Sequence, residues 1–152
     1  MKTKRIYQDP VTYAVIFDKG DEFLEGMLSF AREVGLSASY FTAIGAFSEV
    51  TLGYFDRHRK AYQKNTVNEQ VEVLSLIGDI AIYQHEPKVH AHVVVGKADS
   101  TAHGGHILEA RVWPTLEVII TASPAHLRRQ YDPETGLALI DLEAHSVWMS
   151  VS

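Results

Sequence analysis

Two closely spaced histidines lie in a stretch whose pattern favours a shared metal ion. His90 and His92 alternate with apolar residues in the run 89–95, which is typical of a β-strand. Alternation places both imidazoles on one face of that strand, with their Cα atoms about 6.6 Å apart. Neutral imidazoles are common ligands of zinc and of other divalent metals. The pair therefore predicts two ligands of a metal site.

The third ligand has two candidates, His103 and His106, and strand register decides between them. An antiparallel return centred on Asp99 would place His106 opposite His92, on the same face. A two-residue turn at Lys97-Ala98 would select His103 instead, but neither turn residue favours the positive φ required. Ala-Asp-Ser suits a turn better, although a bulge at the following Gly-Gly pair would reverse the choice. We favour His106 and expect zinc, and histidines that only line a solvated strand face are the alternative.

A metal-dependent enzyme would also need a general acid or base near these histidines. Glu109 is the first candidate because it lies in apolar sequence three residues past the third histidine, although strict alternation turns it to the opposite face. Glu86 and His103 come next, and Glu117 last. Each can equally be a surface group, an ion-pair partner or an orienting group. We assign no catalytic residue from the sequence.

One helix and many short strands are expected to position these residues. Asp21 is a candidate N-cap, apolar residues recur at helical spacing over 22–34, and Gly35 ends the run. The expected strands are 13–17, 39–44, 50–55, 61–64, 70–76, 80–83, 89–95, 116–121 and 137–140. This pattern predicts the α+β class, with a largely antiparallel sheet packed with one main helix and short flanking helices.

Several polar, glycine or proline residues predict where the strands break. Ser48-Glu49 is expected to form a hairpin, and Gly78-Asp79 to interrupt a strand. Pro114 is expected at the entrance of the strand that follows it, because it lacks a backbone N–H. The segment 123–129 is expected to form a helical turn with Pro124 at its first position.

Length and composition exclude several classes of protein. The 152 residues suit one domain over 1–152, and 46% hydrophobic and 22% charged residues are ordinary for a globular protein. With no cysteine, disulfides and thiolate chemistry are excluded. The chain has no nucleotide-binding glycine motif, no GxSxG motif, no apolar run long enough to span a membrane and no apolar signal core. We expect a cytoplasmic location.

The charge distribution gives little support for binding to nucleic acid. The formal net charge is −5, whereas such binding depends on clustered Lys and Arg. The basic clusters are small, and they lie at 2–5, 57–60 and 128–129. We expect solvated surface at each, although an oligomer would multiply any basic patch.

Three segments, 43–56, 71–81 and 87–120, resemble the plants-and-prokaryotes conserved (PPC) domain. The resemblance implies an antiparallel sheet with flanking helices and assembly as a homotrimer. Prokaryotic members of this kind share an HxH…GGH pattern, matched here by His90, His92 and His106, which plant members generally replace. The family's frequent DNA-binding label comes largely from plant nuclear proteins.

Three functions therefore stay open at the level of sequence. The favoured one is a stand-alone PPC protein, a homotrimer with a three-histidine divalent-metal site and an unknown small-molecule ligand. The second is a DNA-binding regulator, as the family label suggests. The third is an oligomeric interaction module whose histidines hold no metal. Whether the protein is an enzyme is left open.

Overall fold

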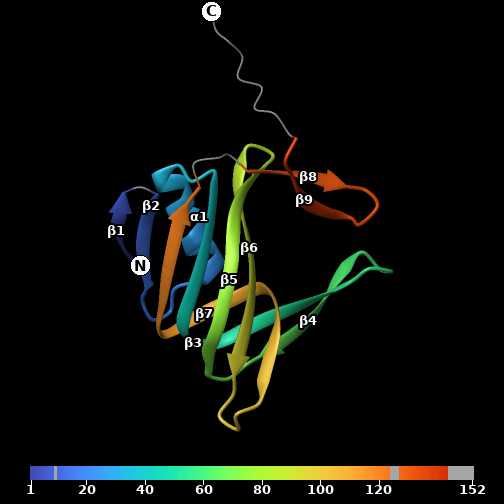
Figure 1. Ribbon diagram of the computed structural model, residues 1–152. Coiled ribbons are helices and arrows are strands. Elements are labelled where there is room, and N and C mark those ends of the chain that lie inside the picture. The colour runs from blue at the N-terminus through green and yellow to red at the C-terminus, as the bar shows by residue number, and fades with distance from the viewer. Residues whose placement is uncertain (9, 124–126, 144–152) are drawn as a thin grey trace, which may run out of the picture.

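The computed structural model describes residues 1–8, 10–123 and 127–143, and these residues form nine strands and one helix (Figure 1). In chain order the elements are β1 (Lys2–Gln8), β2 (Val11–Phe17), α1 (Phe23–Val34), β3 (Ala38–Asp56), β4 (Ala61–Val67), β5 (Val71–Tyr83), β6 (Glu86–Gly96), β7 (Ala102–Ala122), β8 (Arg128–Asp132) and β9 (Leu137–Asp141). The expected antiparallel sheet with one main helix is confirmed. The expected short flanking helices are not found among the described residues.

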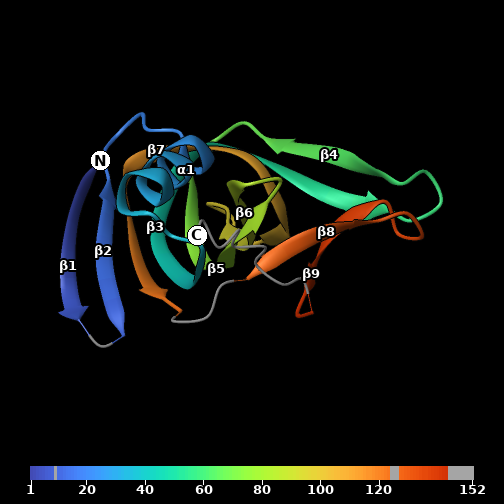
Figure 2. The same cartoon turned by 90° about the horizontal axis from the view of Figure 1, so that it is seen from above.

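The strands form one sheet with a closed section. The main order is β1-β2-β7-β3-β5-β8-β9, while β4 pairs with β3, and β6 pairs with both β5 and β7. Because β3 also pairs with β5 and β7, these four strands form a ring of antiparallel pairs. The β8–β9 hairpin joins β5 through a single parallel pair, Ile82 with Arg128. Seen from above, this hairpin and β4 project on the same side of the sheet (Figure 2).

The expected hairpin at Ser48-Glu49 is wrong, because β3 runs unbroken for 19 residues through that point. Its bend lies at Gly45, whose φ is 147° and whose missing side chain leaves room for the backbone of Thr115. Glycine is suited to both requirements, since a Cβ would be strained and would meet the carbonyl oxygen. The bend lets one long strand pair first with β5 and then with β4.

Gly78-Asp79 does not interrupt its strand either, since β5 continues from Val71 to Tyr83. A side chain at Gly78 would meet the ring of Phe41 and, at 2.5 Å, the carbonyl oxygen of His90. The glycine therefore allows Phe41 and the backbone of His90 to approach β5 closely. The residue after it, Asp79, pairs with His90 on the neighbouring strand β6.

Pro114 lies inside β7, not at a strand entrance. The register between β3 and β7 breaks here, since Gly45 pairs with Leu116 and Phe47 with Val112. A proline without an N–H is tolerated where the ladder is interrupted. The expected helical turn over 123–129 lies partly outside the described residues, at 124–126, and its last two residues belong to β8.

The helix has the expected end but a different start. Its N-cap is Glu22, not Asp21, and the Glu22 carboxylate accepts hydrogen bonds from the backbone N–H of Glu25 at 2.7 Å and of Ala110 at 3.0 Å. Glu22 therefore also ties the helix start to β7. Gly35 at the end adopts the left-handed conformation that its type allows, with φ 69°.

The core lies between α1 and the inner face of the sheet. Phe23, Met27 and Phe30 of the helix are buried against sheet residues such as Phe41 and Phe47. Burying a side chain of this size contributes about 1.5–3 kcal/mol. In β6, Ala91, Val93 and Val95 are buried in the same core, so a one-residue slip of the strand would expose all three. That requirement holds the intervening histidines outside.

Candidate metal centre

The register of β6 and β7 confirms the expected pairing of His92 with His106. His92 pairs with His106, and Val95 pairs with His103. The turn is centred on Asp99, whose carboxylate accepts a hydrogen bond from the backbone N–H of Thr101 at 2.9 Å. The pairing from His92 to Gly96 is regular, so the Gly-Gly pair forms no bulge against β6. His103 lies on the other face, near the exposed end of the hairpin.

The three imidazoles of His90, His92 and His106 converge outside the sheet. Their ring centroids lie 5.0–5.4 Å apart, and one possible ligand atom from each ring lies within 4.8 Å of the others. A tetrahedral zinc site with Zn–N bonds of about 2.1 Å has nitrogens about 3.4 Å apart. Small side-chain rotations therefore suffice to bring three nitrogens onto one ion. The donor set fits zinc or another divalent metal.

The Nδ1 atom of His90 contacts the ion pair formed by Asp79 and Arg129. Its Nδ1 lies 3.5 Å from Oδ2 of Asp79, whose Oδ1 accepts a hydrogen bond from Arg129 Nη2 at 2.6 Å. Burial alone would raise the pKa of the Asp79 carboxyl, but hydrogen bonds to His90 and Arg129 lower it below its usual value. Arg129 Nη2 lies 3.3 Å from the same Nδ1, so Nδ1 of His90 is engaged by both members of this pair and Nε2 is left for a metal.

His106 is the most enclosed of the three rings. Its Nδ1 is buried without a hydrogen-bond partner among the described residues, and its ring stacks on Tyr62 of β4 at a centroid distance of 4.8 Å. Burial, followed by the nearby His90 and His92, lowers the pKa of His106 from 6.5 to about 4. Partial burial and His90 also lower the pKa of His92. Neutral imidazoles are the protonation state that a metal requires.

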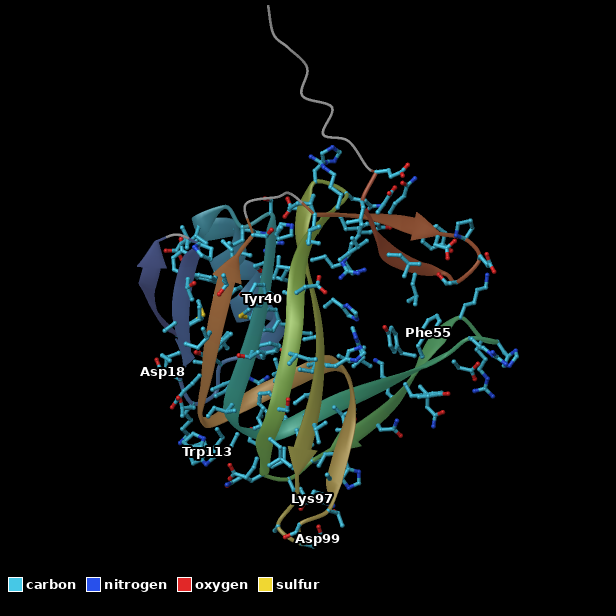
Figure 3. All side chains as sticks on the ribbon, in the orientation of Figure 1. Asp18, Tyr40, Phe55, Lys97, Asp99 and Trp113 are labelled. Carbon is cyan, nitrogen blue, oxygen red and sulfur yellow. The ribbon has the colours of Figure 1, made fainter. Side chains whose placement is uncertain are left out.

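Two clefts meet at the cluster. A cleft of about 360 Å³ on the side of β3 and β5 is lined by His90, His92 and Asp79 together with Tyr40, Phe41, Thr42, Ile77 and Gly78. A smaller cleft of about 150 Å³ on the side of β8 and β9 is lined by His90, His106, Tyr62, Lys88, Val89, Arg129, Leu137, Ala138 and Leu139. Figure 3 shows Tyr40 on β3, on the sheet face that the larger cleft reaches.

The expected acid–base candidates lie away from the cluster. Neither cleft is lined by Glu109, although a register shift in β7 places it on the same face as His106. Glu86 instead pairs with Arg32 of α1 at 3.0 Å. Glu117 lines a separate groove together with Ile44, Leu74 and Ile77. His103 pairs with Val95, which is nearer the turn than the pair of His92 and His106.

Four polar residues around the cluster were missed by reasoning from the sequence: Asp79, Arg129, Tyr62 and Lys88. Asp79 carried a usable signal, because a carboxylate in an apolar strand needs a partner. Tyr62 and Arg129 come from β4 and β8, and no local pattern links them to the histidines. Their contact depends on how two hairpins fold back over β6 and β7.

The fold and the histidine cluster define a β-sheet protein with a candidate three-histidine metal centre. The model of the Plants and Prokaryotes Conserved (PCC) domain matches residues 5–124, and the chain belongs to this family. A metal-containing protein from Archaeoglobus fulgidus is 33% identical with a TM-score of 0.79, over 85% of this chain and 91% of that one.

Two further similarities extend the comparison. A protein from Bacteroides thetaiotaomicron, named as a candidate DNA-binding protein, is 30% identical with a TM-score of 0.88, over 93% of this chain and 97% of that one. The bifunctional protein GlmU of Synechococcus sp. (strain JA-3-3Ab) is 28% identical over 127 residues, which are 82% of this chain. The chain spans only 19% of the length of that relative. Within the part of the chain that the structure describes, no helix is long and apolar enough to cross a membrane.

Proposed function

We propose that the chain binds one divalent metal ion, with zinc expected, through His90, His92 and His106, and that this centre serves a small-molecule ligand. The convergence of three imidazoles from two strands of fixed register carries the proposal. The similarity to a protein named as metal-containing supports it. Three protein ligands leave a coordination position open, as in catalytic zinc sites.

A bound zinc ion would polarise a ligand carbonyl or lower the pKa of a bound water. The protein residues prepare the site for this role. Asp79 and Arg129 fix the orientation of His90, while the stacked ring of Tyr62 fixes that of His106. Tyr62 also lines the smaller cleft, and burial raises the pKa of its phenol, so it stays a proton donor at neutral pH.

The test is elemental analysis of untagged protein, dialysed with a small excess of zinc and then freed of unbound metal. We expect about one zinc per chain in the wild type and loss of it in His92→Ala, because two imidazoles alone hold zinc weakly. His103→Ala is the matched control, since this histidine lies in the same hairpin on the opposite face. Equal zinc content in His92→Ala and the control would refute the site.

We also propose that the protein is a homotrimer that docks through its open sheet face. Ile44, Leu74 and Ile77 are 61%, 56% and 58% exposed on that face, and a groove of about 580 Å³ runs over it. Contiguous exposed apolar surface of this kind is typical of a subunit interface. Because Ile77 also lines the larger cleft with His92, a docked copy would close one side of the metal centre.

The interface is tested by light scattering coupled to gel filtration. Ile44→Lys should reduce the trimer to smaller species, because a buried charge without a partner opposes docking. Val34→Lys, on the last residue of α1, is the matched control and should leave the mass unchanged. A trimeric Ile44→Lys, or a wild type that runs as a monomer, would contradict this assignment.

Binding to DNA is a second candidate, favoured by the name of the Bacteroides relative and by the exposed loop 57–60. Phosphate contacts would make such binding strongly salt-dependent. Duplex titrations at low and moderate salt, with wild type and an Arg57→Ser/Arg59→Ser variant, test it. Binding that is absent at low salt, or unchanged in the variant, would remove this candidate.

A further inference from the structure

The smaller cleft carries a positive charge, that of Lys88, which has no role in the proposed metal site. Lys88 and Arg129 both line it, and the charge of Arg129 is paired with Asp79, which lines the larger cleft. Lys88 has no carboxylate within ion-pair distance among the described residues, and its ammonium lies 4.9 Å from the ring centroid of Tyr83. A metal ion on the histidines would add further positive charge to the same space. The cleft therefore favours an anion.

Arg129 offers an unused donor at this place. Its side chain is only 7% exposed, with Nη2 bound to Asp79 at 2.6 Å and Nη1 bound to the carbonyl oxygen of Ala138 at 3.0 Å. Its Nε is buried and has no hydrogen-bond partner among the described residues. A buried donor is rarely left without an acceptor, so an oxygen atom of a ligand would accept the hydrogen bond that Nε of Arg129 has to offer.

The size and lining of the cleft restrict the ligand further. Its volume is about 150 Å³. A cavity of about that volume holds benzene, which has six non-hydrogen atoms. Leu137 and Leu139 add apolar lining to the cleft, together with Val89, which also packs against the core. A small ligand with one charged end and a short aliphatic part matches this lining.

We propose that the cleft binds a small organic acid of about six non-hydrogen atoms, its carboxylate held by Lys88 and Arg129 and a second oxygen directed to the metal. This inference rests on the metal site proposed above, because His90 and His106 form the shared wall of the cleft. The organic acid would occupy the coordination position that the three histidines leave open. Leu137 and Leu139 would contact the carbon chain.

The experiment compares lactate with lactamide, its uncharged amide of nearly equal size, by calorimetric titration into zinc-loaded protein. Zinc content is measured first on every sample. We expect lactate to bind at least about tenfold more tightly than lactamide, because a charge-assisted bond is stronger than a neutral one. Lys88→Met should weaken lactate binding about tenfold at unchanged zinc content, and Lys88→Arg should restore it.

Lys97→Met is the matched control, because it removes a lysine charge just after the far end of the same strand, where Lys97 pairs with Glu69 at 2.6 Å. It should bind lactate like the wild type. Equal affinity for lactate and lactamide, or wild-type affinity in Lys88→Met, would overturn the anion site while leaving the metal site intact. Wild type that binds no zinc would overturn both, and the zinc measurement distinguishes these two failures.

Discussion

Acid should destabilise the metal-free protein through His106. Folding lowers the pKa of this imidazole from 6.5 to about 4. Between these values the unfolded chain binds a proton that the folded chain does not. The free energy of unfolding is therefore unaffected by this group well above pH 6.5 and falls progressively as the pH drops toward 4.

The size of the effect follows from the same two values. At about pH 5 the full shift corresponds to a loss of about 2 kcal/mol in the free energy of unfolding. The ring is only partly buried, so solvent screening reduces the expected loss to about 1 kcal/mol. The main cause is burial of the ring, with repulsion from His90 and His92 as a smaller cause.

The assay is urea unfolding with a chelator present, at about pH 7.5 and about pH 5 and at one fixed protein concentration. His106→Gln does not titrate in this range, so it serves as the reference for all other acid effects. The wild type should lose about 1 kcal/mol more than His106→Gln between the two pH values. An equal loss in both proteins would refute the assigned burial of His106.

Two further substitutions test how the site is supported. Asp79→Asn should lower zinc affinity by about tenfold in a chelator competition, because it removes the anion that orients His90; unchanged affinity would exclude that role. Gly78→Ala should lower the free energy of unfolding by about 1–3 kcal/mol, because the added Cβ meets the ring of Phe41 and the backbone of His90. Gly96→Ala is the control, since its Cβ meets only the flexible side chain of Leu74, at 3.1 Å. Equal losses of stability in the two variants would contradict the close approach at Gly78.

Much of the candidate site could be predicted from the sequence because its geometry is local. His92 and His106 are joined by one short turn, and both the alternation of β6 and the turn chemistry at Asp99 act over a few residues. These local constraints fix which imidazoles share a face. The helix and its terminal Gly35 were predictable for the same reason.

The surroundings of the site could not be predicted, because they depend on long-range packing. Arg129 reaches Asp79 across 50 residues, and no periodic pattern records that contact. The unbroken course of β3 was missed for a related reason. Ser48-Glu49 looks like a turn locally, but pairing with β7 on one side keeps the strand extended, and Gly45 absorbs the bend instead.

The weak attachment of the β8–β9 hairpin has a thermodynamic consequence. One residue pair joins it to β5, and Arg129 joins it to the histidines, since its Nη2 lies 3.3 Å from Nδ1 of His90 and binds Asp79. A metal that fixes His90 must therefore also favour the docked hairpin, and a docked hairpin must raise metal affinity by the same factor. Backbone amides in β8 and β9 should exchange with deuterium more slowly once zinc is added, which would make this hairpin a reporter of occupancy.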